Sequence, residues 1–250
     1  MRISAIIEAR MSSKRLPGKV MADIGGKPML EKLVERLRKS AVVDTLVVAT
    51  PDTNDNRPIW EWCLEQKDIK IHRGSEGDVM KRVLDAAKAT NTDIIVEITG
   101  DCPLIDPEIV NLIAAYCVCD HDCAVNINPT TWPQGMDVRA FKTECLAAAE
   151  RETRGQDEYR EHVSTYLYRK GSQFDWRNLA APPTETCPEL NLSVDTEEDL
   201  RRVKDIFSAL EPLNPNFKVG DILKYLVSLP TYYDILSKPS LFKEAVWSTS

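Results

Sequence analysis

Short apolar segments alternate with amphipathic ones through the first half of the chain, and this order restricts the fold more than any single motif does. Four segments rich in Ile and Val predict β-strands, at residues 4–8, 45–49, 69–72 and 93–98. The segments between them have apolar residues on one helical face and predict helices, at 29–39, 58–66 and 79–89. Alternating strands and helices predict an α/β fold, with a mostly parallel sheet flanked by helices on both faces.

The second half of the chain is less regular. Apolar segments predict strands at 124–128, 136–141 and 190–194, and helices at 143–152, 158–169 and 219–228. A further helix should begin at Asp195-Thr196-Glu197-Glu198, because this run is typical of an N-cap followed by an acidic first turn. No repeat or linker divides the chain, so we expect one domain over 1–238, with residues 124–180 as an elaboration over the site. Residues 239–250 are expected to form a C-terminal tail.

The composition is that of an ordinary globular protein, with 43% apolar and 28% charged residues. No stretch approaches the roughly 20 apolar residues that a membrane-spanning helix requires. Residue 1 leads straight into a predicted strand rather than a signal peptide. We therefore expect a cytoplasmic protein without membrane insertion. The formal net charge of -7, with no basic face beyond residues 10–19, argues against nucleic-acid binding.

Seven cysteines form an odd set without the spacing of a disulfide scaffold, so we expect reduced thiols. The tightest group is Cys117, Cys119 and Cys123, with His121 between them. Structural zinc sites usually draw their ligands from two separate chain elements, whereas this group lies at the end of a predicted apolar helix at 109–116. Buried apolar roles for these cysteines are therefore favoured over metal binding.

A basic loop follows the first predicted strand. Its cations are Arg10, Lys14, Arg15 and Lys19, its hydroxyls are Ser12 and Ser13, and its turn residues are Pro17 and Gly18. Open α/β sheets bind ligands beyond the carboxyl ends of their strands, which is where this loop should lie. Arginine, lysine and backbone amide donors suit a polyphosphate. The chain lacks Gly-x-Gly-x-x-Gly after this strand and lacks a Gly-Lys-Ser/Thr P-loop, so a dehydrogenase or P-loop NTPase is not favoured.

Two aspartates follow predicted strands and are candidates for a magnesium site. Asp101 comes after the strand at 93–98, next to Gly100, and Asp195 comes after the strand at 190–194. Mg²⁺ is commonly bound by one or two carboxylates together with substrate phosphates. The alternatives are a turn aspartate at position 101 and a helix N-cap at position 195. Together with the basic loop, the two acids make a coherent site for a metal and a polyphosphate.

His162 is predicted on an amphipathic helix with Val163 and Leu167, a setting in which a lone histidine is more often structural. Arg160, two residues earlier, favours a role in acceptor binding instead. General-base catalysis by His162 has weaker support, because nucleotidyl transfer depends mostly on positioning and charge neutralisation. A structural role and an acceptor-binding role both stay open for His162.

Several segments together resemble one enzyme family and keep its order along the chain. They are ARMSSKRLPGK (9–19), GGKPML (25–30), RGSEGDV (73–79), ITGDCPLIDP (98–107), PQGMDV (133–138), YREHV (159–163) and VDTEEDL (194–200). The chain resembles the SpsF-like cytidylyltransferase family of the spore coat polysaccharide type, which is related to the 3-deoxy-manno-octulosonate and acylneuraminate cytidylyltransferases. It departs from the octulosonate enzymes at Cys102, where they typically have Glu, and this difference concerns the acceptor rather than the reaction.

The resemblance implies a Rossmann-like nucleotide-diphospho-sugar transferase fold, usually dimeric. It implies nucleotide binding by Arg10, Ser12, Ser13, Arg15, Lys19, Gly74, Ser75 and Asp101, and acceptor binding by Gln134, Asp137, Arg160 and His162. The catalytic set would be Arg10, Lys19, Asp101 and Asp195, in which Asp101 and Asp195 would also hold Mg²⁺. The implied partners are CTP, an acidic sugar acceptor and a second copy of the chain.

The resulting hypothesis is a Mg²⁺-dependent cytidylyltransferase. It would transfer CMP from CTP to an acidic sugar of the octulosonic or nonulosonic acid type, release pyrophosphate and serve surface polysaccharide biosynthesis. One alternative is a nucleotide-sugar-dependent glycosyltransferase, which would normally have an Asp-x-Asp metal motif that Gly100-Asp101-Cys102 lacks. A non-catalytic nucleotide-binding protein is the other alternative, although the basic loop shows no sign of degeneration.

Overall fold

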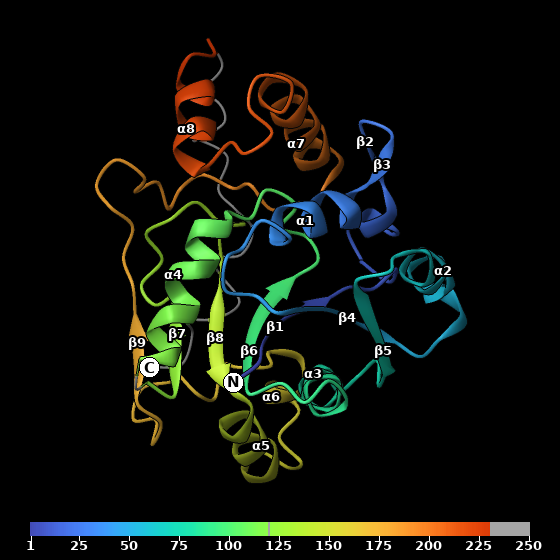
Figure 1. Cartoon of the computed structure of the whole chain (residues 1–250), viewed down its shortest axis with the longest axis vertical. Helices are drawn as coiled ribbons and strands as arrows, with labels where there is room; N and C mark the ends of the chain where they lie inside the picture. Colours follow the sequence, from blue (N-terminus) through green and yellow to red (C-terminus); the bar gives the residue numbers. More distant parts are fainter. Residues whose placement is uncertain (120, 231–250) are drawn as a thin grey trace.

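The computed structural model describes residues 1–119 and 121–230, and its centre is a seven-stranded sheet (Figure 1). The strands lie in the order β5-β4-β1-β6-β8-β7-β9. Their bounds are β1 Ile3–Glu8, β4 Thr45–Pro51, β5 Ile69–Gly74, β6 Ile94–Thr99, β7 Cys123–Val125, β8 Arg139–Lys142 and β9 Trp176–Asn178. β1, β4, β5 and β6 run parallel, β8 is antiparallel to both of its neighbours, and β9 is parallel to β7. The prediction of a mostly parallel α/β sheet is confirmed.

The order of the strands changes direction at β1. From β1 the chain continues to β4 and β5 on one side, and it then returns to add β6 on the other side of β1. Such a switch point leaves a crevice beyond the carboxyl ends of the two central strands, where open α/β sheets bind their ligands. The last residues of β1 and β6, Glu8 and Thr99, are register partners. The basic loop after β1 and Asp101 after β6 therefore leave the sheet at the same edge.

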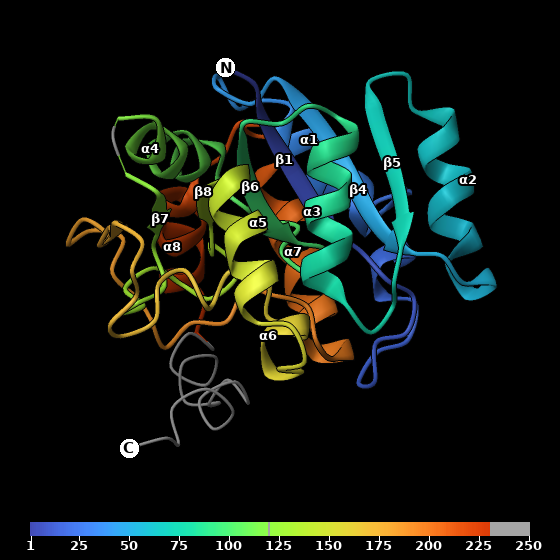
Figure 2. The ribbon, with the colours of Figure 1, turned by 90° about the horizontal axis from the view of Figure 1, so that it is seen from below.

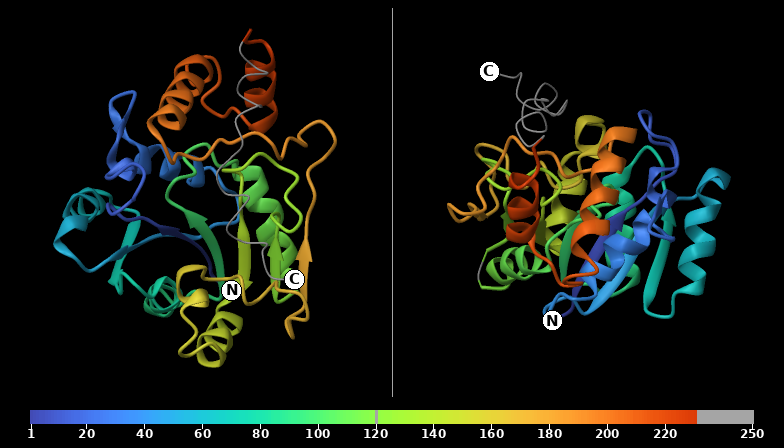
Figure 3. Two further views of the ribbon diagram at one scale, coloured as in Figure 1. Left: turned by 180° about the vertical axis from the view of Figure 1, so that it is seen from behind. Right: turned by 90° about the horizontal axis from the view of Figure 1, so that it is seen from above.

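Helices cover both faces of the sheet and enclose two separate apolar cores (Figure 2). The larger core includes α1 Met29–Leu37, α2 Arg57–Glu65, α4 Pro107–Val118, α7 Glu197–Leu210 and α8 Val219–Val227. The smaller core includes α3 Val79–Ala89 and α5 Thr143–Glu152, and the short α6 Glu158–Glu161 lies beside α3. Figure 3 shows α7 and α8 together above the sheet, on the side of α1. Within residues 1–119 and 121–230, no helix is long and apolar enough to cross a bilayer.

The helix predicted at 158–169 is wrong beyond its first turn. α6 ends at Glu161, because His162 adopts φ -103° and ψ 78°, and the residues after it form turns. Val163 and Leu167 nevertheless lie in the smaller core. Tertiary packing buries these apolar residues without a continuous helix, so the apolar pattern alone predicted the wrong backbone.

The strand predicted at 190–194 is also wrong. This segment is irregular and pairs with the middle of the chain through a single bridge, between Gln134 and Asn191. The side-chain oxygen of Asn191 accepts hydrogen bonds from the amide and the hydroxyl of Ser193, at 2.9 and 2.7 Å. Local bonds of this kind offer the backbone an alternative to a strand ladder, and they explain why the apolar residues here do not form one.

Other elements differ in extent or have no counterpart among the predictions. The strand predicted at 136–141 begins only at Arg139, and β9 is not predicted. β2 Asp23–Ile24 and β3 Lys27–Pro28 form a hairpin that is closed by Gly25 and Gly26, at φ 63° and 85°. Positive φ at both central residues is the signature of a Gly-Gly hairpin turn. The predicted tail at 239–250 lies outside the described residues.

α7 begins at a capping box that lies directly beside Asp195. Thr196 Oγ1 accepts a hydrogen bond from the Asp199 amide (3.2 Å), and Asp199 Oδ2 accepts one from the Thr196 amide (2.9 Å). Asp199 Oδ2 also accepts a bond from the amide of Asp195, at 3.1 Å. Thr196 is therefore the N-cap, and the alternative role of Asp195 as a helix cap is wrong.

We expect Thr196→Ala to destabilise the protein by about 1 kcal/mol, the usual cost of losing a side-chain cap. For a chain of this size that corresponds to a fall of roughly 2–4 °C in melting temperature. Thr196→Ser keeps the hydroxyl and should melt close to the wild type. Thermal unfolding followed by circular dichroism measures both variants, and an unchanged melting temperature for Thr196→Ala would show that the box does not stabilise α7.

Candidate functional site

The basic loop forms a compact turn at the carboxyl end of β1. The carbonyl of Met11 accepts hydrogen bonds from the amides of Ser13 (3.0 Å) and Gly18 (2.9 Å), and the Met11 amide donates to Asn56 Oδ1 (2.9 Å). Gly18 has φ 75°, a conformation that favours glycine, and the short helix η1 Lys19–Met21 follows it. This turn directs the Lys19 side chain back towards the sheet edge.

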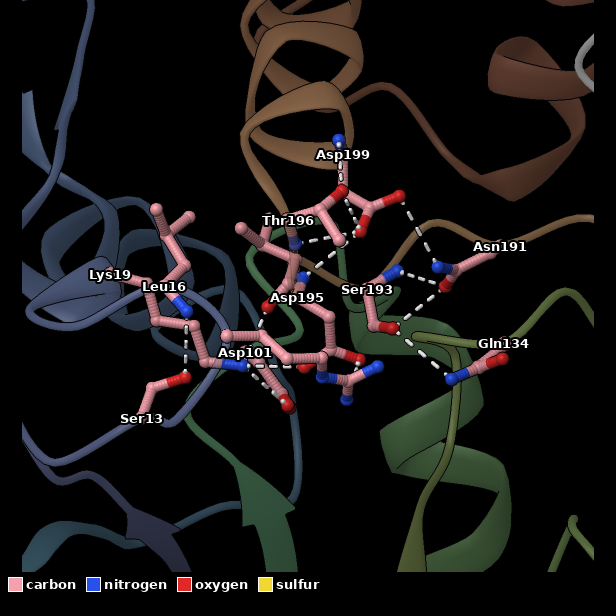
Figure 4. A network of polar contacts seen from close by, with 12 residues as sticks. Ser13, Leu16, Lys19, Asp101, Gln134, Asn191, Ser193, Asp195, Thr196 and Asp199 are labelled. Atoms are coloured by element: carbon pink, nitrogen blue, oxygen red, sulfur yellow. Dashed lines mark hydrogen bonds and ion pairs between the residues drawn. The ribbon is translucent and has the colours of Figure 1, made fainter. Parts of the chain in front are cut away.

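Lys19 is the centre of the site (Figure 4). Its Nζ donates hydrogen bonds to Asp101 Oδ2 (3.1 Å), Asp195 Oδ1 (2.9 Å) and the Val194 carbonyl (2.6 Å). The residue is only 8% exposed. Arg15 forms an ion pair with the other carboxylate oxygen of Asp195, at 2.8 Å. The structure thus brings four of the predicted site residues into one ionic network.

The charges in this network stabilise one another. Burial alone would lower the pKa of Lys19, but Asp101 and Asp195 together raise it above its ordinary value. Burial would likewise raise the pKa of Asp101, but Lys19 and a hydrogen bond from Thr99 hold it below its ordinary value. At neutral pH the network therefore holds a lysine ammonium against ionised aspartate.

Close backbone contacts fix Asp101 at this position. The Gly100 amide donates to the Glu8 carbonyl at 2.9 Å, and a Cβ on Gly100 would lie only 2.7 Å from that oxygen. On the other side, the Val194 amide donates to the Asp101 carbonyl at 2.9 Å. Glycine is therefore required beside Asp101, and the segment before α7 reaches the end of β6 through its backbone.

The two aspartates have a donor chemistry that fits a hard divalent cation. Their carboxylates approach one ammonium from two chain elements, and the Asp101 side chain is 25% exposed. Among the residues that the structure describes, no group of three or more His, Cys, Asp or Glu is arranged to hold a metal ion. A cation between Asp101 and Asp195 would therefore need further ligands from a substrate, which is how Mg²⁺ is usually bound beside phosphates.

The described part of the chain contains all seven cysteines, and none of them belongs to a cluster of three or more potential metal ligands there. All seven are free, and Cys117 and Cys123 are buried while Cys119 is exposed. Burial raises the pKa of Cys117 to about 12, so its thiol stays protonated. The predicted buried apolar role agrees with the positions of Cys117 and Cys123, and it is wrong for the exposed Cys119.

The other residues predicted to bind nucleotide lie along the loops after β1 and β5. Ser12 Oγ donates to Glu76 Oε1 at 2.9 Å, so the two loops touch. The Ser75 hydroxyl, next to Gly74, accepts a bond from the Asp78 amide (3.0 Å) at the start of α3. Ser13 Oγ accepts a long bond from the Leu16 amide (3.4 Å) within the basic loop. Arg10 forms an exposed ion pair with Glu161, at 3.4 Å.

The residues predicted to bind the acceptor divide into two groups. Gln134 Nε2 donates a hydrogen bond to Ser193 Oγ at 3.2 Å, and Ser193 lies two residues before Asp195. Burial raises the pKa of Asp137, and the negative charge of Asp101 raises it further. Arg160 lies elsewhere. Its guanidinium donates to the Glu150 carbonyl (3.0 Å) and the Thr153 hydroxyl (2.8 Å) and forms ion pairs with Asp78 and Glu150, so it joins α3, α5 and α6. His162 is the C-cap of α6.

A second charged cluster lies at the same sheet edge and includes residues that the sequence did not single out. Glu8, Glu97 and Arg139 come from the adjacent strands β1, β6 and β8, and Glu97 pairs with Arg139 in register, with Oε1 3.8 Å from Nη1. One side-chain atom of each residue is buried without a hydrogen-bond partner. A charged residue inside an apolar strand, as in Ile95-Val96-Glu97-Ile98, was the available signal.

Comparisons with known proteins agree with this geometry. A family model described as "Cytidylyltransferase" matches residues 4–219. The spore coat polysaccharide biosynthesis protein SpsF of Bacillus subtilis is 32% identical over 207 residues, which cover 81% of this chain and 85% of SpsF. A 3-deoxy-manno-octulosonate cytidylyltransferase of Solibacter usitatus is 27% identical, with 83% of this chain and 95% of that protein covered. The structure of a cytidylyltransferase from Leptospira borgpetersenii is similar at a TM-score of 0.87 and 30% identity, over 96% of this chain and 99% of that one.

We expect Glu8→Gln to change the pH dependence of stability. Burial, reinforced by Glu97, raises the pKa of Glu8 from 4.5 to about 8. The folded protein therefore binds this proton more tightly than the unfolded chain does, and stability falls as the pH rises from about 4.5 to 8. Glutamine cannot ionise, so Glu8→Gln does not lose this stability. The melting temperature of Glu8→Gln, relative to that of the wild type, should therefore rise between pH 5 and pH 9. We expect a gain of at least roughly 2–4 °C, the effect of 1 kcal/mol in a chain of this size.

Glu65→Gln provides the control, because it makes the same substitution at an exposed position outside the buried cluster. A difference in melting temperature between Glu8→Gln and the wild type that stays constant with pH would show that Glu8 is not held protonated by its surroundings.

Proposed function

The chain belongs to the cytidylyltransferase family and is a CTP-dependent nucleotidyltransferase, and from this premise we propose that it transfers CMP from CTP to an acidic sugar. The acceptor class we propose is an octulosonic or nonulosonic acid, because 3-deoxy-manno-octulosonate cytidylyltransferases are among the chain's relatives. Its similarity to a spore coat polysaccharide biosynthesis protein supports a place in surface polysaccharide biosynthesis.

The observation that supports this proposal most is the network around Lys19. A buried ammonium, two carboxylates and a basic loop meet beyond the carboxyl ends of β1 and β6, at the switch point of the sheet. This is the position at which open α/β sheets bind nucleotides. Lysine and arginine donors suit the triphosphate, and the two carboxylates suit Mg²⁺ that is shared with the phosphates.

In the proposed reaction an acceptor hydroxyl oxygen attacks the α-phosphorus of CTP. The new oxygen–phosphorus bond forms as the bond to the β-phosphate bridging oxygen breaks, so that pyrophosphate leaves and the hydroxyl proton passes to solvent water. Arg10 and Lys19 would neutralise charge that develops on the departing pyrophosphate. Asp101 and Asp195 would hold Mg²⁺, whose chemistry when bound is to offset phosphate charge and to make the acceptor hydroxyl more acidic.

The remaining predicted residues would orient the two substrates. Ser12, Ser13, Arg15, Gly74 and Ser75 would position the nucleotide, and Gln134, Asp137, Arg160 and His162 would meet the acceptor. Gln134 and Asp137 have the stronger structural support, because they lie next to the Lys19 network, whereas Arg160 already has several partners. We also propose a homodimer, on the basis of the family resemblance, which the mass of the protein in solution tests.

Pyrophosphate release tests the proposal. The protein is incubated with Mg²⁺, one nucleoside triphosphate and each member of a panel of acidic sugars. We expect release with CTP and an octulosonic or nonulosonic acid, and much less with GTP or ATP at limiting concentration. Equal turnover of all three nucleotides would contradict the proposed base preference, and CTP turnover only with neutral sugars would contradict the acidic acceptor. Transfer of a sugar from a nucleotide sugar, without pyrophosphate release, would support the glycosyltransferase alternative instead.

We expect Asp101→Asn and Asp195→Asn each to lower kcat by at least about 10²–10³, the usual effect of removing one group that stabilises charge in the transition state. Asp205→Asn, on the exposed side of α7, removes the same charge away from the site and should keep full activity. Steady-state kinetics at saturating CTP measure all three variants. Near-normal turnover of Asp195→Asn, with a wild-type melting curve, would rule out a two-carboxylate site.

A further inference from the structure

The three donors of Lys19 are all in use. A lysine ammonium has three N–H groups, and those of Lys19 donate to Asp101, Asp195 and the Val194 carbonyl at 3.1, 2.9 and 2.6 Å. In this arrangement no donor remains for a phosphate oxygen. Each of the two carboxylates, in turn, directs one oxygen at the ammonium.

This geometry is incompatible with the roles that the proposed function gives to the same groups. Lys19 cannot contact the phosphates while it bridges Asp101 and Asp195. A divalent cation placed between those carboxylates would lie close to the ammonium, and the two positive charges would repel each other in a buried setting. The two arrangements must therefore alternate.

The formal charges explain why the observed arrangement is stable. Lys19 and Arg15 supply two positive charges, and Asp101 and Asp195 supply two negative charges, so the network is neutral as it stands. A lysine has a flexible four-carbon stem, so its ammonium can change partners without a change in the backbone.

We infer that Lys19 is a built-in counter-cation that occupies the metal position between Asp101 and Asp195 before nucleotide binds. When nucleotide binds, the ammonium moves to the phosphates and releases both carboxylates to the divalent cation. This inference rests on the proposed function, and it adds that metal and CTP bind cooperatively through the exchange of one side chain. Metal binding to the protein alone is correspondingly weak. By linkage, each ligand raises the affinity for the other by the same factor.

Binding of Mn²⁺ to the nucleotide-free protein tests this inference, with electron paramagnetic resonance as the readout and without turnover. Lys19→Met removes the charge and keeps much of the side-chain volume, whereas Lys19→Arg keeps the charge as the matched control. We expect Lys19→Met to bind Mn²⁺ at least about five- to tenfold more tightly than the wild type, within the usual range for coupled sites. Lys19→Arg should bind Mn²⁺ weakly, like the wild type. CTP should increase Mn²⁺ affinity strongly in the wild type and little in Lys19→Met.

A thermal shift by Mn²⁺ provides a second readout, because the ion should stabilise Lys19→Met more than the wild type. Lys19→Gln replaces Lys19→Met if the methionine variant does not fold. Unchanged or weaker Mn²⁺ binding in a folded, uncharged variant would overturn the exchange and leave Lys19 as a permanent structural partner of the two acids. In that case, the proposed function would still be supported if the wild type binds Mn²⁺ and CTP together. Failure of the wild type to bind CTP under any condition would instead overturn the proposed function.

Discussion

The burial of one ammonium between two carboxylates is the interaction on which the rest of the site depends. Lys19 joins the loop after β1, the turn after β6 and the segment before α7, which are far apart in the sequence. A buried charge that loses one partner destabilises a protein by about 3–5 kcal/mol, so the three segments are held together as a set. The long irregular stretch before α7 is tolerated because its end is anchored at Val194 and Asp195.

The two charged clusters at this sheet edge are electrostatically linked. The Glu8 carbonyl fixes Gly100 beside Asp101, while the Glu8 carboxyl belongs to the cluster with Glu97 and Arg139. The charge of Asp101 contributes to the raised pKa of Glu8, after burial and Glu97. A proton on Glu8 therefore limits the negative charge that accumulates around Asp101. Any cation that approaches Asp101 would lower the pKa of Glu8, so occupation of one cluster changes the charge of the other.

The sequence predicted the parts of this protein that depend on local patterns. Strands β1, β4, β5 and β6 and helix α5 followed from periodicity, and the basic loop and Asp101 were identified because open sheets bind ligands at strand ends. Asp195 was identified from a predicted strand at 190–194 that the structure does not contain. The failures occurred where something other than periodicity decides the backbone, which is tertiary packing at 158–169 and local side-chain bonds at 190–194. The latter segment is fixed by side-chain bonds of Asn191 that no periodicity reveals. The ion-pair partners of Lys19 were not predictable either, because they lie far from it in the sequence and no local pattern identifies them.

The Lys19 network and the segment around Gln134 are supported by different kinds of structure, and this difference affects the specificity for the acceptor. The Lys19 network rests on strand ends and on a helix cap, whereas Gln134 belongs to an irregular segment attached by one bridge to Asn191. That attachment is tight, because Gly135 has φ 95° and a Cβ there would lie 2.7 Å from the Ser193 amide nitrogen. Substitutions elsewhere in this segment can reshape the proposed acceptor side without moving a strand. A change of acceptor thus requires only loop residues to change, while the proposed nucleotide chemistry stays fixed by the sheet.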